Sequence, residues 1–275
     1  MKKGTIALIG CGNMGGCLLS GLIADGYSTQ RLRVSDVSAD RLRLITNRFP
    51  VSTSTDNTRV VQGADVVVLA VKPEVMKTVA TTLAAAIGRQ RPLVISIAAG
   101  ISTRSLSQWL GPAVAIVRAM PNTPALVGSG VAALFANKFV QQQQREIAEL
   151  VLRAVGLTVW LDEETLMDAV TAVSGSGPAY FFLLMELVER SAIGMGLPRH
   201  LARLLTLQTA FGAAKMALEA SVDTASLRNQ VTSPGGTTEQ AIRVLQDAGL
   251  SSIVDQALKA AQRRSQELAK LFGES

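Results

Sequence analysis

The sequence has few of the residues on which metal, disulfide or redox-thiol chemistry depends. It contains two cysteines, one histidine and only 4% aromatic residues. Cys11 and Cys17 lie six residues apart, which matches no zinc-ligand spacing and would place a disulfide across a strand-to-helix turn. We therefore expect free thiols and no metal site. The lone His200 follows Gly196-Leu197-Pro198, where a helix is expected to begin, and we interpret it as a surface residue rather than a catalytic one.

Long apolar runs and long basic runs are also absent. The first apolar run, Thr5–Ile9, breaks at Gly10, and a later one, Ala179–Met185, ends at Glu186, so both are too short for a signal peptide or a bilayer span. We expect a cytoplasmic protein without a membrane partner. The net charge is +6, yet no Lys/Arg run exceeds Arg263-Arg264. This pattern argues against nucleic acid and suits a phosphate-rich cofactor with a carboxylate substrate.

Charged residues make up only 17% of the chain, whereas hydrophobic residues make up 48%. A chain of 275 residues with this composition can form two domains and a sizeable core. The low charge also indicates that part of the surface is covered by self-association, so we expect a homo-oligomer.

The first half alternates β-rich runs with helical stretches. Expected strands are Thr5–Ile9, Arg31–Ser35, Asp65–Val71, Pro92–Ile97, Ala113–Arg118, Val131–Ala136 and Thr158–Leu161. Expected helices are Asn13–Ala24, Ala39–Arg48, Glu74–Ile87, Thr103–Leu110 and Gln141–Val155. The runs from residues 65 and 92 are almost continuously apolar, as in strands buried on both faces of a parallel sheet. This alternation predicts an α/β fold, a doubly wound Rossmann sheet over residues 1–163.

After residue 163 the strand signal disappears. The remaining segments are helical: Pro178–Ile193, Arg199–Glu219, Thr224–Val231, Thr238–Ala248 and Ser251–Phe272. We therefore predict a second, all-helical domain over residues 164–275.

A glycine-rich turn follows the first strand. Gly10-Cys11-Gly12-Asn13-Met14-Gly15 matches G-x-G-x-x-G and opens the first helix, which is the context that a dinucleotide site requires. Gly10 permits the tight turn, Gly12 has no side chain to block the pyrophosphate, and Gly15 lets the helix approach the strand. The helix start then attracts phosphate through its free amides and its dipole.

The second strand ends at Ser35-Asp36. An acidic residue about twenty positions after the glycines usually binds the ribose hydroxyls of NAD and repels a 2′-phosphate. Ser35, Ser38 and Arg41 are close enough in sequence to bind a phosphate instead. We expect NADPH or NADH as the cofactor and leave the choice open.

The other loops that leave the carboxyl ends of strands are expected to line the same crevice. They are Ala70-Val71-Lys72-Pro73, Ala98-Ala99-Gly100 and Met120-Pro121-Asn122-Thr123-Pro124. Lys72 is a candidate to approach the nicotinamide or the substrate, and the alternative is a surface lysine at a helix start.

Two loops of the helical half combine hydroxyls with glycines before a helix: Ser174-Gly175-Ser176-Gly177-Pro178 and Thr232-Ser233-Pro234-Gly235-Gly236-Thr237-Thr238. In the second, Thr237 and Gln240 have the spacing of a capping box, with Glu239 in the first turn. Glycine amides that lead into a helix start can bind a small carboxylate. The alternative is two ordinary capped helix starts.

Together these segments resemble Δ1-pyrroline-5-carboxylate reductase. The resemblance spans essentially the whole chain, and its second-half motifs are more specific than the glycine fingerprint. Besides the segments above, it rests on Ser96–Gly100, Asp168–Val170, Ser174–Tyr180, Met195–Pro198, Gly212–Met216 and Ser233–Thr238. It implies NAD(P)H-dependent reduction of pyrroline-5-carboxylate to L-proline, the last step of proline biosynthesis, by a Rossmann domain followed by a helical dimerisation domain. It also implies an intertwined homodimer, which in many members assembles into a decamer.

The resemblance also implies site residues. The cofactor should contact Ile9, Gly10, Cys11, Gly12, Asn13, Met14, Ser35, Asp36, Asn57, Ala70, Val71, Lys72, Pro73, Ile97, Ala98, Ala99 and Gln230. The substrate should contact Asn122, Glu164, Ser176, Ser233, Gly236, Thr237 and Thr238. Thr238 and Lys72 are the catalytic candidates, with Thr238 bonded to the ring nitrogen or the carboxylate. Asp36 departs from the family, whose NADPH-using members often have a small or basic residue there.

Two other functions fit parts of the pattern. A β-hydroxyacid dehydrogenase also joins a Rossmann half to a helical half, but it needs a catalytic lysine in the helical domain, and Lys215 is the only mid-helix candidate. A dinucleotide-binding sensor or scaffold would bind the cofactor without turnover. Water or solvent acid can protonate the imine before it binds, so a strong protein acid is not required for the reductase.

Overall fold

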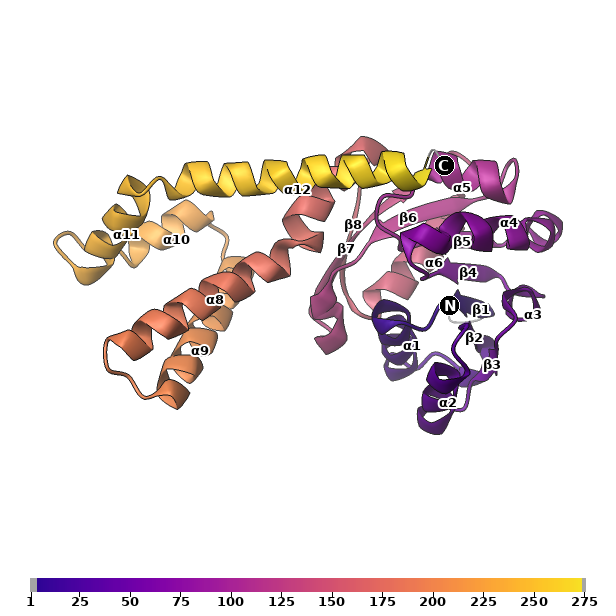
Figure 1. Ribbon diagram of the computed structural model, residues 1–275, viewed down its shortest axis with the longest axis horizontal. Helices are drawn as coiled ribbons and strands as arrows, with labels where there is room; N and C mark the ends of the chain where they lie inside the picture. Colours follow the sequence, from indigo (N-terminus) through magenta and orange to yellow (C-terminus); the bar gives the residue numbers. More distant parts are fainter. Residues whose placement is uncertain (1–3, 274–275) are drawn as a thin grey trace. The chain divides into compact units, whose positions relative to one another are not determined.

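The computed structural model describes residues 4–273 (Figure 1). Its contacts divide the chain into two compact units. The first unit holds the residues up to Ser176 together with those from Ala261 onward, and the second unit is Gly177–Ala260. The predicted boundary after residue 163 is not tested by this division and stays a prediction.

The first unit contains one eight-stranded sheet in the order β3-β2-β1-β4-β5-β6-β7-β8. The strands are β1 Ile6–Ile9, β2 Leu32–Ser35, β3 Ser52–Ser54, β4 Val66–Leu69, β5 Leu93–Ser96, β6 Ile116–Met120, β7 Gly130–Ala136 and β8 Gly156–Trp160. From β3 to β6 all neighbours pair in parallel, and the order 3-2-1-4-5-6 is that of the Rossmann fold. In register, Ile9 lies beside Ser35 on one side and Leu69 on the other. The carboxyl ends of β1, β2 and β4 therefore meet at one edge.

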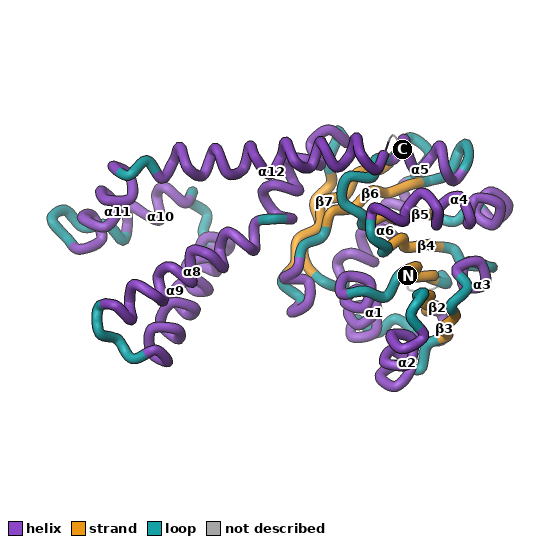
Figure 2. The backbone as a smooth tube through the Cα atoms, in the orientation of Figure 1, coloured by secondary structure: helices purple, strands orange, loops and turns teal. Residues whose placement is uncertain are grey.

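Helices cover both faces of this sheet (Figure 2). They are α1 Asn13–Ala24, α2 Ala39–Arg48, α3 Asn57–Val61, α4 Pro73–Gln90, α5 Thr103–Leu110 and α6 Gln142–Arg153. Leu8 of β1 packs in one core with α1, α2 and α6, while its neighbour Ile9 packs in the other with α3, α4 and α5. Successive residues of a strand point to opposite faces, which explains why the central strands are apolar throughout.

The strand β7 runs antiparallel to β6 and parallel to β8. Only residues 121–129 join β6 to β7, and they include the short 3-10 helix Thr123–Val127. A parallel crossover needs a dozen or more residues, so this connection reverses the chain direction. The strand β3 and the helix α3 were not predicted. The sequence of β3, Ser-Thr-Ser, is short and polar, and it contains no buried residue, so no apolar periodicity marks it.

Residues 164–176 form short turns of helix: Glu164–Leu166, α7 Met167–Val170 and the π-turn Thr171–Gly175. They pack against the sheet unit, where the Asn122 side-chain amide donates to the carbonyl of Ser174 over 3.1 Å. The end of the last helix belongs to the same unit, because the Ser265 hydroxyl donates to Asp168 over 2.7 Å.

The second unit is helical, as predicted. It contains α8 Gly177–Gly194, α9 Arg199–Glu219, α10 Thr224–Gln230, α11 Thr237–Asp247 and the first part of α12 Leu250–Gly273. Large apolar side chains on α8 and α9 are exposed, among them Phe181, Phe182, Leu204, Leu205 and Phe211. Apolar surface of this extent indicates a protein partner. Over residues 4–273, no helix has both the length and the apolar character needed to cross a bilayer.

Candidate functional site

The three glycines of the fingerprint occupy three different environments. Gly10 has φ +95°, and a Cβ there would lie 2.7 Å from the Ala70 carbonyl oxygen. A Cβ on Gly15 would lie 2.2 Å from the Gly10 carbonyl oxygen, so α1 can approach the turn only because this residue is glycine. At Gly12, by contrast, no atom lies within 4 Å of a Cβ position. Gly10 and Gly15 are thus required by packing, whereas Gly12 leaves space open above the loop.

The start of α1 has the features of a phosphate site. Gly12 is the N-cap of the helix, and no side chain caps it. The first amides of a helix have no partner within the helix, so those of α1 are available to an anion. A pyrophosphate fits this geometry, since the open space at Gly12 lies where those amides begin. The glycine loop therefore fits a dinucleotide.

The other predicted cofactor loops leave the same edge of the sheet. Ala70 follows β4 and its amide donates to the Ile9 carbonyl over 2.8 Å, and Ile97 follows β5 and donates to Leu69 over 3.1 Å. Asn57 is the first residue of α3. Lys72 is the exposed N-cap of α4. The fold thus gathers the loops as predicted, while the roles of the individual side chains, and of Lys72 in particular, stay predictions.

Ser35 and Asp36 follow at the end of β2, and both are buried. The Ser35 hydroxyl has no hydrogen-bond partner within the part of the chain that the structure describes. The Ser35 carbonyl accepts from the amide of Gly10 over 2.8 Å, and the Asp36 carboxylate accepts from the amide of Cys11 over 2.8 Å. The end of β2 therefore holds the glycine loop directly.

Asn122 is a predicted substrate residue whose side chain is already engaged in the protein. Its Oδ1 accepts from the amide of Val131 over 2.9 Å, and its Nδ2 donates to the Ser174 carbonyl. It is 9% exposed. These bonds fix the loop after β6 to the start of β7 and to the turn before Ser176, so Asn122 shapes this region through the backbone.

Glu164 lies in a network that the sequence analysis missed. Its carboxylate accepts from the Thr103 amide over 2.7 Å and from the Thr103 hydroxyl over 2.6 Å, and it pairs with Arg118 over 3.1 Å. The Arg118 side chain is 8% exposed. A signal was present in the sequence, because Arg118 is the one charged residue of the buried strand Ile-Val-Arg-Ala-Met. A buried arginine needs an acidic partner.

Glu164→Ala should destabilise the first unit strongly. The substitution leaves the Arg118 charge and the Thr103 amide without their partner; breaking a fully buried pair costs about 3–5 kcal/mol, and because the Glu164 side chain is 21% exposed we expect a loss of about 3 kcal/mol. Urea unfolding measures the loss. Glu219→Ala is the matched control, because it breaks the exposed Lys215–Glu219 pair, where we expect less than about 1 kcal/mol. If Glu164→Ala weakens substrate binding and leaves the free energy of unfolding unchanged, Glu164 acts only as a substrate contact.

Of the predicted site residues of the helical half, Glu164 and Ser176 lie in the first unit, whereas Gln230 and those from Ser233 to Thr238 lie in the second. Gln230 ends α10, and Ser233 and Gly236 lie in the loop before α11. The predicted capping box is wrong: α11 begins at Thr237, its N-cap is Gly236, and no side chain caps it. The Glu239 carboxylate, in the first turn as expected, instead accepts from the amide of Gly235 over 2.8 Å. A glycine N-cap leaves the Thr237 and Thr238 hydroxyls free of a capping role.

Both cysteines are free, as expected from their spacing, and both are buried. Burial raises the pKa of the Cys11 thiol, the nearby Asp36 charge raises it further, and Arg41 partly offsets the shift. Burial also raises the pKa of Cys17. A raised pKa lowers the fraction of reactive thiolate at every pH below it.

Thiol reagents should therefore label the native protein slowly at pH 8. We expect a rate at least about tenfold below that of the unfolded chain, because thiolate content and access both fall. A disulfide reagent whose product is coloured measures both rates. Two thiols should react promptly after denaturation. Prompt reaction of either thiol in the native protein would contradict the burial seen here.

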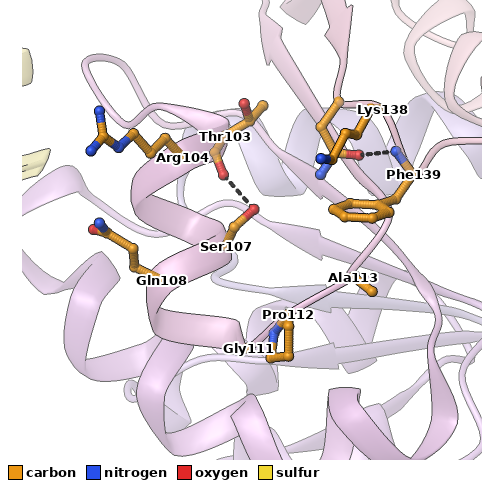
Figure 3. A pocket seen from close by; sticks show the side chains of 10 residues that line it. Thr103, Arg104, Ser107, Gln108, Gly111, Pro112, Ala113, Lys138 and Phe139 are labelled. Atoms are coloured by element: carbon orange, nitrogen blue, oxygen red, sulfur yellow. Dashed lines mark hydrogen bonds between the residues drawn. The ribbon is translucent and has the colours of Figure 1, made fainter.

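An open surface pocket of about 650 Å³ lies elsewhere in the first unit (Figure 3). It is lined by α5 and by the segments before β6 and after β7, which lie at the sheet edge opposite to the glycine loop. The Ser107 hydroxyl in its lining donates to the Thr103 carbonyl over 2.8 Å. None of the predicted site residues lines it, so it is not the site expected from the sequence.

Comparisons with known proteins agree with this geometry. Residues 5–100 match the family model described as NADP oxidoreductase, coenzyme F420-dependent, and residues 164–268 match pyrroline-5-carboxylate reductase dimerisation. The pyrroline-5-carboxylate reductase of Pseudomonas aeruginosa is 49% identical and is covered completely, as is this chain.

Solved structures give the same result. The pyrroline-5-carboxylate reductase structure from Coxiella burnetii has a TM-score of 0.92 at 46% identity and covers 96% of this chain and 98% of its own. The Plasmodium falciparum enzyme, solved with NADP bound, has a TM-score of 0.87 at 27% identity and covers 98% of this chain and 99% of its own. The resemblance found in the sequence is confirmed: the chain belongs to the pyrroline-5-carboxylate reductase family.

Proposed function

We propose that this chain reduces Δ1-pyrroline-5-carboxylate to L-proline, with NADH or NADPH bound at the glycine loop after β1 and the substrate carboxylate bound at the start of α11. The observation that carries the proposal is the open space at Gly12 above the uncapped start of α1, in a chain whose family is shown. A bound nicotinamide would supply the hydride for the imine carbon.

The start of α11 supplies a second anion site. Its N-cap is Gly236, and the amides of its first turn have no partner within the helix. These amides and the hydroxyls of Thr237 and Thr238 suit a small carboxylate. A protonated imine nitrogen can enter already charged from solvent, so the chain need only orient the ring. Good orientation can lower the barrier by about 7–11 kcal/mol.

The proposal is tested by mixing the protein with pyrroline-5-carboxylate and either nucleotide. We expect loss of NAD(P)H absorbance together with formation of proline in equal amount. The matched assay offers NAD⁺ and 3-hydroxy acids, where we expect no turnover. Nucleotide binding without proline formation would refute the proposal in favour of a binding protein.

The same proposal includes a specific form of self-association, in which two chains form an intertwined homodimer and these dimers assemble into a decamer. The dimerisation match and the exposed apolar faces of α8 and α9 support it. Light scattering should then give a mass of two or ten chains of 29.0 kDa. A monomer at micromolar concentration would contradict it.

A cytoplasmic location is the remaining part of the proposal. The two cysteines are free thiols, which is typical of a reducing compartment. Fractionation of cells that contain the protein would test the location, and recovery outside the cytoplasm would contradict it.

A further inference from the structure

The carboxylate of Asp36 occupies the position at which many Rossmann proteins bind ribose. It follows β2 directly, and the usual rule assigns it the ribose hydroxyls and the rejection of a 2′-phosphate. That rule requires a carboxylate that a ligand can reach. Asp36, however, is only 6% exposed.

Both oxygens of this carboxylate already bind backbone amides. Oδ2 accepts from the amide of Cys11 over 2.8 Å, and Oδ1 accepts from the amide of Ser38 over 2.9 Å. The Arg41 guanidinium lies 3.6 Å from Oδ2. One side chain thus connects the glycine loop after β1 to the loop between β2 and α2.

A second bond reinforces the same connection, since the amide of Gly10 donates to the carbonyl of Ser35. Two successive amides of the glycine loop, those of Gly10 and Cys11, are therefore fixed by the end of β2. The next residue, Gly12, is the one whose surroundings are open and which begins α1. Fixing the loop before the ligand arrives reduces the entropy that binding would otherwise lose.

We propose that Asp36 is a positioning residue that holds the glycine loop in its phosphate-binding shape, rather than the residue that chooses between NADH and NADPH. The proposal rests on the dinucleotide site of the proposed function. Asp36 then supports binding of the pyrophosphate, which both nucleotides share. The nearby Arg41 offsets the negative charge of Asp36. The acidic residue at this place then does not exclude NADPH.

The ribose-binding role and the positioning role predict different results for Asp36→Ala. A ribose-binding aspartate, once removed, would shift the ratio of the two dissociation constants towards NADPH. A positioning aspartate, once removed, weakens both nucleotides together. We expect about tenfold weaker binding of each, the effect of losing one hydrogen bond to a charged group, with their ratio changed by less than about threefold. Titration calorimetry with NADPH and NADH measures both constants without turnover.

Hydrogen exchange of the full-length protein without nucleotide gives a second readout. The amide of Cys11 should exchange about tenfold faster in Asp36→Ala than in the wild type, because its acceptor is gone. A role confined to the ribose would leave this rate unchanged. Arg41→Met is the matched control, since it removes the neighbouring cation and keeps both amide bonds, and its Cys11 exchange should match the wild type.

Asp36→Asn keeps the size and one oxygen acceptor, and it serves if the alanine variant does not fold. It should show intermediate exchange and an unchanged ratio of dissociation constants. Unchanged exchange at Cys11 in Asp36→Ala, or a shift of about tenfold towards NADPH in either variant, would overturn the proposal. A wild-type protein that binds neither nucleotide would refute the proposed function instead, while the exchange experiment would still decide whether Asp36 holds the loop.

Discussion

Gly12→Val should abolish dinucleotide binding while leaving the fold intact. The wild-type structure has no atom within 4 Å of a Cβ at this position, so the valine Cβ does not clash with the protein. It instead fills the space that the pyrophosphate needs. We expect dissociation constants for NADH and NADPH to rise by at least about 10²-fold, which corresponds to about 2.7 kcal/mol.

Gly16→Val is the matched control for this prediction. Gly16 lies one turn further along α1, and a Cβ there also meets no atom within 4 Å. Valine is a better helix former than glycine, so this variant should be as stable as the wild type and bind both nucleotides normally. Valine at the N-cap position 12 costs about 1 kcal/mol of stability, which thermal unfolding separates from the binding effect. Normal nucleotide affinity in Gly12→Val would place the pyrophosphate elsewhere.

The Rossmann half could be predicted because its signals are local. The central strands are apolar on both faces, and every helix between them except the five-residue α3 has its own periodicity and start signal. The glycine fingerprint predicted the tight turn at Gly10 and the close helix approach at Gly15, and the open surroundings of Gly12 fit the pyrophosphate role that stays a prediction. The same local reasoning fails at β3, because its three residues have no apolar pattern. This strand forms by pairing with β2.

Contacts between distant residues could not be predicted from single positions. The substrate role of Glu164 follows from family resemblance and stays a prediction, but no pattern indicated that its carboxylate contacts Thr103 and Arg118, which lie 61 and 46 residues away in the chain. For Asp36 the spacing rule favours the ribose hydroxyls, but it does not say where the carboxylate points. Thr237 failed as an N-cap because the helix begins one residue earlier, and cap spacing alone does not fix that choice. For Glu164 and Asp36 the contacting partner is a backbone amide or a buried charge that no motif describes.

Thr238→Ala should lower kcat/KM for pyrroline-5-carboxylate by about 10²-fold, the effect of losing one positioned catalytic hydrogen bond. Thr238 is the second residue of α11, is partly buried and has no capping role, because Gly236 is the N-cap. Its hydroxyl is thus available to the ring nitrogen or the carboxylate of the substrate. The dissociation constant for NADPH should not change, since the glycine loop is untouched. Steady-state kinetics and nucleotide titration measure the two effects separately.

Thr238→Ser and Thr224→Ala complete the test. Serine keeps the hydroxyl and should restore most of the activity, whereas a loss caused only by altered packing would not be rescued in this way. Thr224 begins α10, is exposed and lies outside the predicted site, so Thr224→Ala should keep wild-type kinetics. Both alanine variants should unfold within about 0.5 kcal/mol of the wild type, as is usual for substitutions away from the core. Wild-type turnover in Thr238→Ala would remove this residue from the catalytic site and leave the backbone amides of α11 and the Thr237 hydroxyl as the substrate contacts there.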